Sequence, residues 1–330
     1  MRARPPKTLV VLVVAGAVAA FGLSQTTAFA ASSPSSPTAP PPTELREVFE
    51  PGGSIQQVRV PVTRVARPLA VGAAVTAKVS AIQQTGTSAQ RFDLVFVGDG
   101  YTASEQGLFH EQAVARWAQL SAIEPFKSLK NNFNVWEVDA VSKQSGVDND
   151  PTNGVQKDTA LNGGFWCSGL DRLVCVNDAT AQQYAALAPQ VDQTLVLVNS
   201  TTYGGSGGGV TVSSGGNALS GDIVAHELGH SIGGLADEYG GSGTYTGAEL
   251  TEPNSSKSNE ATMRAKGTKW ASYLGKATPD GGVIGTFEGS SYYDKGVFRP
   301  SENSMMRSLG RSFNLIGIDA LRTAILKKSS

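Results

Sequence analysis

The sequence predicts an α/β domain of the α+β kind, built on a mixed sheet and preceded by a small β segment. Buried-strand patterns at residues 92–99, 133–141 and 193–200 alternate with stretches whose apolar residues recur at helical spacing. Because strands and helices alternate in this way, we expect a mixed sheet packed against helices.

The elements follow one another in a definite order. Residues 44–88 contain short alternating runs such as "SIQQVRVPVTRV", which predict a small N-terminal β segment that is also a candidate propeptide. The main domain is expected over residues 89–330. Its first strand, "FDLVFVGDGYT", ends in a Gly-Asp-Gly turn, and an amphipathic helix should follow over residues 104–123. A last amphipathic helix is expected over residues 314–328.

The N-terminus has the pattern of an export signal. A basic start, the apolar run Leu9–Leu23 and the small residues of "AFA" are typical of a signal peptide, residues 1–30, cleaved between Ala30 and Ala31. An uncleaved membrane anchor is the alternative, but the apolar run is short for a span. Residues 31–43, rich in Pro and Ser, predict a linker. We therefore expect a secreted, extracellular protein with no membrane segment in its mature form.

Charge and cysteine content narrow the classes of function. Lys and Arg number 27 against 28 for Asp and Glu, so nothing favours a nucleic-acid or membrane-surface partner. The two cysteines, Cys167 and Cys175, predict a structural disulfide in an exported chain. A monomer is the expected state.

The chemistry is carried by "IVAHELGHSIGGLADEY", residues 223–239. On a helix, His226 and His230 lie four residues apart on one face, so both imidazoles can bind one metal ion. Glu227, beside them, can hold and deprotonate a water at that ion. Two surface histidines on an ordinary helix are the alternative, but these are two of only three histidines in the chain. The motif therefore predicts a zinc site with Glu227 as general base.

The third ligand is expected to be a carboxylate, because the remaining histidine, His110, lies in another amphipathic helix and should be a surface residue. Asp237 is favoured. Glu238, its neighbour, and Glu260 in "SNEATM" remain alternatives.

Asp237 can reach the ion only if the helix ends before it. On a continuous helix it would lie about 10 Å beyond His230 along the axis, too far to share an ion. Gly233 and Gly234 can end the helix in a left-handed turn that brings the chain back towards the metal.

"HELGHSIGGLADEY" resembles the signature of the IgA-peptidase family of bacterial zinc metallopeptidases, a metzincin-like group. "FDLVFVGDGYTASEQ", "NSTTYGGSGG" and "YYDKGVFRPSENSMMR" resemble further family blocks, in the family's order, over roughly residues 90–310. The resemblance implies a zincin or metzincin-like metalloprotease domain with an active-site helix. It also implies one catalytic zinc held by His226, His230 and Asp237, with Glu227 as general base.

The resemblance extends to "SMMR", which it implies is a Met-turn beneath the metal ligands, with Met305 or Met306 supplying the methionine. The family often has a cysteine where this chain has Ser304. Without the resemblance, the two methionines would be read as plain core residues.

The predicted activity is that of a zinc metalloendopeptidase acting on a protein or peptide substrate. Zinc with three protein ligands leaves a position for water and lowers its pKa, and Glu227 takes the proton and passes it to the leaving amine. Tyr239, Tyr292 and Tyr293 are candidates for stabilising the oxyanion, with plain packing as the alternative. The alternatives are a catalytically silent binding protein with this fold, and a zinc hydrolase of a non-peptide amide.

Two further segments are candidates for binding. Leu195–Gly209, a strand with its glycine-rich loop, could form the rim of a substrate cleft where an extended peptide pairs by strand addition, or be a flexible loop. Gly146–Gly154, "GVDNDPTNG", has oxygen ligands suited to calcium, although it lacks the spacing of a calcium loop and a solvated turn is favoured.

Overall fold

A computed structural model describes residues 43–61 and 75–329 of the chain. The predicted signal peptide, residues 1–30, lies outside the described residues, as does the predicted linker up to residue 42. None of the helices formed by the described residues is long and apolar enough to cross a membrane.

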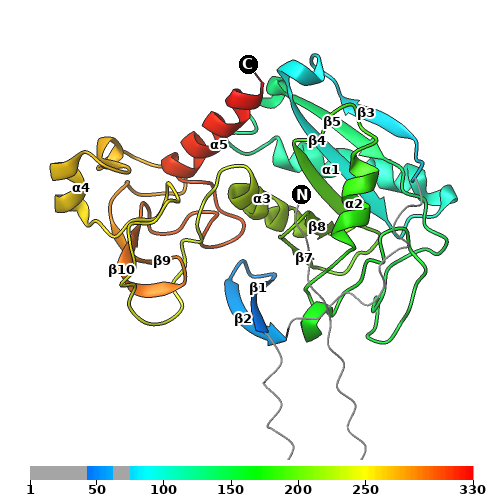
Figure 1. The fold of residues 1–330 in the computed structure, drawn as a ribbon, viewed down its shortest axis with the longest axis horizontal. Helices are drawn as coiled ribbons and strands as arrows, with labels where there is room; N and C mark the ends of the chain where they lie inside the picture. The colour runs from blue at the N-terminus through cyan, green and yellow to red at the C-terminus, as the bar shows by residue number, and fades with distance from the viewer. Residues whose placement is uncertain (1–42, 62–74, 330) are drawn as a thin grey trace, which may run out of the picture. The chain divides into compact units, whose positions relative to one another are not determined.

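A six-stranded sheet forms the centre of the domain (Figure 1). In spatial order its strands are β3 (Val79–Gln83), β5 (Phe133–Val138), β4 (Phe92–Asp99), β6 (Gln193–Val198), β8 (Thr211–Ser214) and β7 (Gly205–Ser206). The four central strands are parallel, whereas β3 and β7 run antiparallel at the two edges. The predicted mixed α/β fold is confirmed.

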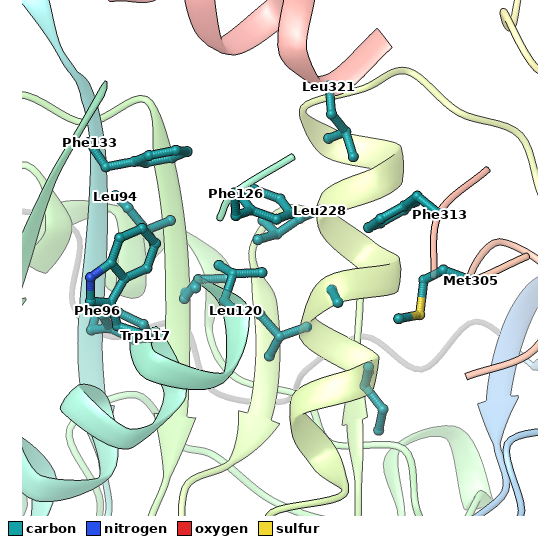
Figure 2. Packing of buried hydrophobic residues seen from close by; sticks show 14 of the residues in the cluster. Leu94, Phe96, Trp117, Leu120, Phe126, Phe133, Leu228, Met305, Phe313 and Leu321 are labelled. Carbon is teal, nitrogen blue, oxygen red and sulfur yellow. The ribbon is translucent and has the colours of Figure 1, made fainter. Parts of the chain in front are cut away.

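Each face of the sheet packs on a different set of helices, because alternate residues of a strand point to opposite faces. Leu94 and Phe96 of β4 share a core with α1 (Gln106–Leu120), α3 (Ser220–Ser231) and α5 (Leu315–Lys328) (Figure 2). Val95 and Val97 share the other core with α2 (Asp178–Ala185). The helix with the HExxH motif, α3, is thus held against the sheet by an apolar face.

Two smaller units adjoin α3. The C-terminal region contains α4 (Glu260–Lys266) and an antiparallel pair, β9 (Phe287–Ser290) and β10 (Tyr293–Arg299). The N-terminal hairpin consists of β1 (Thr43–Phe49) and β2 (Ile55–Pro61).

The N-terminal strands do not all form one segment. Phe49 and Ile55 of the hairpin join the core that contains α3. In contrast, β3, which lies within the N-terminal β segment predicted for residues 44–88, pairs along β5 as an edge strand of the main sheet. The sheet domain therefore includes residues before the expected start at Ala89.

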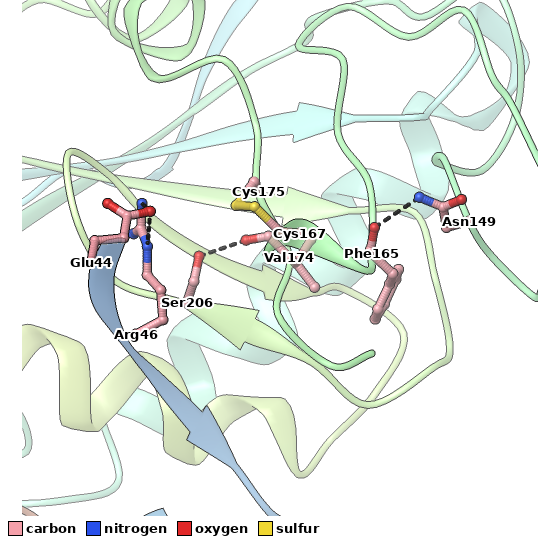
Figure 3. The surroundings of a disulfide bond; sticks show 8 residues. All are labelled: Glu44, Arg46, Asn149, Phe165, Cys167, Val174, Cys175 and Ser206. Carbon is pink, nitrogen blue, oxygen red and sulfur yellow. Dashed lines mark hydrogen bonds and ion pairs between the residues drawn. A yellow bond between two sulfur atoms is a disulfide. The ribbon is translucent and has the colours of Figure 1, made fainter. Parts of the chain in front are cut away.

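The predicted disulfide between Cys167 and Cys175 is present (Figure 3). It closes a short loop next to β7, where the Ser206 hydroxyl donates a hydrogen bond to the Val174 carbonyl at 2.6 Å. The bridge thus fixes a loop that borders the end strand of the sheet.

Gly229 lies inside α3 because the helix packs closely on its neighbours there. A methyl group at this position would overlap the Met306 sulfur and lie 3.1 Å from the Phe313 ring. Gly229→Ala should therefore lose about 1–3 kcal/mol by overpacking, more than the gain of about 1 kcal/mol in helix propensity, so that its melting temperature falls.

Gly107→Ala is the matched control, since nothing lies within 4 Å of an added methyl group in α1. Its melting temperature should stay the same or rise, because only the helix-propensity gain acts. Thermal unfolding followed by circular dichroism compares the two variants. Equal shifts in both would contradict close packing at Gly229.

Candidate metal centre

The metal centre begins on α3, where His226 and His230 present their Nε2 atoms 3.1 Å apart. The remaining ring nitrogens are held by backbone carbonyls. His226 Nδ1 lies 3.1 Å from the Met305 carbonyl oxygen, and His230 Nδ1 lies 2.7 Å from that of Leu235. Since a carbonyl only accepts, each Nδ1 carries the proton and each Nε2 lone pair points into the centre.

The helix ends where the glycines predict. The last helical residue is Ser231, and Gly234 has a left-handed φ of +59° with its N–H donating to the His230 carbonyl at 3.0 Å. The Leu235 N–H also donates to the Gly229 carbonyl at 3.1 Å, so two backbone hydrogen bonds close this glycine-based, left-handed helix end. The chain turns back, and Asp237 arrives beside the imidazoles.

Asp237 completes a triangle of ligand atoms. Its Oδ1 lies 3.3 Å from His226 Nε2 and 3.4 Å from His230 Nε2. Four atoms at about 2.0–2.1 Å around a tetrahedral zinc ion lie about 3.3 Å from one another. Asp237 Oδ1 is buried and has no hydrogen-bond partner among the described residues. An oxygen atom that binds a metal ion is expected to lack such a partner when the ion is absent.

The electrostatics of the centre also favour a cation. Burial lowers the pKa of both imidazoles, but the carboxylates of Asp237 and Glu47 outweigh this effect. The pKa of His230 rises to about 9, and that of His226 rises well above its ordinary value. The centre therefore concentrates positive charge, as protons or as a metal ion that displaces them.

Glu227 lies beside the triangle and faces a cavity of about 420 Å³. Its carboxylate packs directly on Gly207 of the glycine-rich loop, where any side chain would collide with it. Burial, with repulsion from Glu47, raises the pKa of Glu227 to about 7. A carboxylate with a pKa near neutrality can both accept and return a proton.

The competing acidic residues lie elsewhere. Glu238 is buried, and its carboxylate accepts hydrogen bonds from Asn254 Nδ2 at 2.9 Å, Asn314 Nδ2 at 2.9 Å and Ser304 Oγ at 2.7 Å. Burial raises the pKa of Glu238 to about 7. It therefore joins three loops beside the centre and points away from the imidazoles.

Two other candidate residues are also outside the centre. His110 is half-exposed and its Nδ1 lies 2.8 Å from a carboxylate oxygen of Glu137. Glu260 begins α4 and pairs with Arg264 at 2.8 Å. Neither belongs to the cluster of metal-ligating side chains found in the described ranges.

The "SMMR" segment forms a turn under α3. The Arg307 N–H donates to the Ser304 carbonyl at 2.9 Å, and both Met305 and Met306 are buried. Met305 supplies the carbonyl that orients His226, whereas the Met306 sulfur packs on Gly229. The two methionines thus support the same helix in different ways.

Of the three tyrosines, Tyr292 contacts a member of the triangle. Its hydroxyl donates to Asp237 Oδ2. Ser291 and Tyr292 form the two-residue turn between β9 and β10, with φ of +49° and +70°. A left-handed backbone conformation costs roughly 1 kcal/mol or more of folding free energy for each such residue. The position of Tyr292 is therefore maintained against this strain. Tyr293 packs on Tyr245 instead.

Sequence reasoning missed one member of the cluster. Glu47 of β1 offers a carboxylate oxygen 3.7 Å from His226 Nε2 and 3.8 Å from His230 Nε2. The alternating pattern of residues 44–61 predicts a strand but contains nothing that links it to a metal. Tertiary contacts bring the hairpin to the centre, among them the packing of Phe49 against the His226 ring at 5.6 Å.

The structure also locates the glycine-rich loop and the segment Gly146–Gly154, the two other segments that the sequence suggests for binding. Residues 206–208 of the glycine-rich loop line the cavity beside Glu227. In Gly146–Gly154, Asp148 accepts from the Lys157 N–H and Asp150 from the Thr202 hydroxyl, as in a hydrogen-bonded loop. The one group of three or more metal-ligating side chains among residues 43–61 and 75–329 is the centre on α3.

A mixed sheet, a helix with paired histidines and a buried carboxylate are consistent with a metallopeptidase domain. The family model described as IgA Peptidase M64 matches residues 80–281 and 276–325. The chain therefore belongs to this peptidase family, as its motifs predict. No curated protein matches the chain.

The ligand assignment can be tested by exchanging the two adjacent acids separately. Asp237→Ala should lower zinc affinity by about 100-fold or more, because one of three converging donors is lost. Glu238→Ala should keep the zinc but lose about 2–4 kcal/mol of stability, because three buried donors lose their acceptor. Bound zinc measured by mass spectrometry, with melting temperatures, separates the two effects. Full zinc retention in Asp237→Ala would contradict the assignment.

Proposed function

We propose that the protein is a secreted zinc-dependent endopeptidase, with His226, His230 and Asp237 as zinc ligands and Glu227 as general base. One observation carries this proposal: three lone-pair atoms converge at 3.1–3.4 Å directly beside a buried carboxylate that faces a cavity. Membership of the peptidase family supports hydrolysis of peptide bonds as the reaction. The substrate is a protein or peptide.

The residues of the chain have separate roles in this reaction. Zinc, when bound, would polarise the scissile carbonyl and lower the pKa of a water molecule. Glu227 takes the proton of the attacking water and delivers it to the leaving amine. The pKa of about 7 that burial gives Glu227 suits both transfers. The Tyr292 hydroxyl donates its one proton to Asp237 Oδ2, so it supports the proposed ligand in this conformation and can donate to a developing oxyanion only after it turns away from Asp237.

The cavity beside Glu227 suits an extended peptide. Residues 206–208 form one wall. Gly205, the first residue of β7, already pairs with Leu173, so a peptide can pair only with the backbone from Ser206 onwards. An edge strand can bind a peptide through main-chain hydrogen bonds, which accepts many side-chain sequences. We propose that substrate binds along this wall.

We further propose that the protein works outside the cell as a monomer. The disulfide between Cys167 and Cys175 suits an oxidising compartment. The signal-peptide pattern of residues 1–30 also supports export.

The role of Glu227 can be tested with Glu227→Gln, which removes the base but keeps the volume of the side chain. Cleavage of casein by the zinc-loaded variant should fall by about 10²–10⁴-fold, the usual contribution of general base catalysis. Bound zinc should remain at one equivalent, because Glu227 is outside the triangle of ligands.

Glu260→Ala is the control, since Glu260 is an exposed acid far from the cluster. It should leave both cleavage and zinc content unchanged. If the zinc-loaded wild type and the zinc-loaded Glu47→Gln variant both cleave neither casein nor a peptide library, the endopeptidase proposal fails and a binding protein or an amide hydrolase replaces it. If Glu227→Gln cleaves as fast as the wild type, the assigned base is wrong.

A further inference from the structure

Glu47 approaches the metal centre from the side that the three proposed ligands leave open. Its carboxylate Oε2 lies 3.7 Å from His226 Nε2 and 3.8 Å from His230 Nε2, and all four ligand atoms lie within 4.8 Å of one another. A zinc ion that hydrolyses peptides needs a fourth position for water. In this conformation a carboxylate stands at that position.

The Glu47 side chain is held in place by its neighbours. The Tyr239 hydroxyl donates a hydrogen bond to Glu47 Oε1, which leaves Oε2 directed at the imidazoles. The adjacent Phe49 is buried against the His226 ring. The carboxylate is therefore positioned by contacts on both sides.

The hairpin that carries Glu47 is anchored at its turn. Glu50 pairs with Arg172 at 2.6 Å, and the Leu309 N–H donates to the Gly53 carbonyl at 2.8 Å. The Tyr203 hydroxyl adds a hydrogen bond to the Glu50 carbonyl at 3.3 Å. These contacts are polar, and the Glu50–Arg172 pair is about one-third exposed, so it can be exchanged for water at a modest cost.

The hairpin also occupies the proposed substrate cleft. Leu45, Arg46 and Glu47 line the cavity of about 420 Å³ opposite Glu227, and β1 contacts β7 (Figures 1 and 3). On its other side the hairpin lines a second cavity, of about 590 Å³, that extends to Tyr292. A peptide bound along residues 206–208 would need the space that β1 fills.

We propose that the hairpin Thr43–Pro61 is an autoinhibitory segment of this peptidase, in which Glu47 ligates the metal in place of water while β1 fills the substrate cleft. The proposal rests on the function proposed above. The form of the chain described here is then latent, and activity requires that the hairpin be displaced or removed. The hairpin precedes the region that matches the family, residues 80–325, which fits an added regulatory part.

The test compares Glu47→Gln with Glu44→Gln in the full-length protein. Glu44 is an acid of the same strand that pairs with Arg46 at 3.0 Å and is not part of the metal cluster. Both variants are loaded with Co²⁺, whose visible absorption reports changes at the metal, and titrated with acetohydroxamate, a small metal-binding ligand. Casein cleavage by the zinc-loaded forms is measured in parallel.

We expect Glu47→Gln to bind acetohydroxamate at least 10-fold more tightly than the wild type and to cleave casein at least 10-fold faster. Glu44→Gln should match the wild type in both measurements. Tyr239→Phe removes the hydrogen bond that holds the carboxylate and should raise acetohydroxamate affinity and casein cleavage by a smaller factor of about 3. The Tyr239→Phe variant also tests the proposal if Glu47→Gln does not fold.

Two results would overturn the autoinhibitory role. One is equal acetohydroxamate affinity in Glu47→Gln, Tyr239→Phe and the wild type. The other is slower casein cleavage by the fully zinc-loaded Glu47→Gln variant than by the wild type, because Glu47 would then be a ligand that the active enzyme requires. Tighter acetohydroxamate binding without casein cleavage by any form would instead support the hairpin proposal and refute the endopeptidase function.

Discussion

The structure depends on the convergence of three lone pairs, from two imidazoles and one carboxylate, within 3.1–3.4 Å of one another. Such a group repels itself unless positive charge lies between its members, so it must be held by rigid surroundings. Helix α3 supplies the spacing of the histidines, and the sheet holds α3 by its apolar face. The left-handed turn at Gly234 reverses the chain so that Asp237 comes to lie beside the imidazoles. Each of these parts is needed before a metal can bind.

The loops around the centre are joined by a second buried acid. Glu238 receives hydrogen bonds from Asn254, Ser304 and Asn314, which come from three separate stretches of the C-terminal region. Its backbone N–H donates to the Met306 carbonyl at 2.7 Å, next to the carbonyl of Met305 that orients His226. The two acids that are adjacent in the sequence therefore have different roles. Asp237 faces the imidazoles, and Glu238 positions the turn beneath them. A buried carboxylate is tolerated here because each of its oxygens accepts hydrogen bonds.

The N-terminal hairpin contributes apolar residues to the core and a carboxylate to the metal centre. Its apolar residues Phe49 and Ile55 belong to the same core as α3, so burial of apolar surface favours the docked position. The same docking brings a carboxylate to the metal centre, where its negative charge complements a cation. The hairpin is held by one partly exposed ion pair, a few hydrogen bonds and a few apolar side chains, so it can be both well placed and removable. The proposed autoinhibitory role requires this combination.

The sequence by itself determined three strands of the sheet, the helix with the HExxH motif, the disulfide and the helix end at the glycines, because each depends on residues close together in the chain. Buried apolar runs located β4, β5 and β6, and the spacing of His226 and His230 located α3 and placed both imidazoles on one face. The tertiary structure alone decided the rest. The pairing of β3 with β5 and the approach of Glu47 to the histidines join residues about 50 and 180 positions apart, and no local pattern encodes such contacts. Likewise, Asp237 and Glu238 are chemically equivalent in sequence, and only the direction of the chain after Gly234 separates their roles.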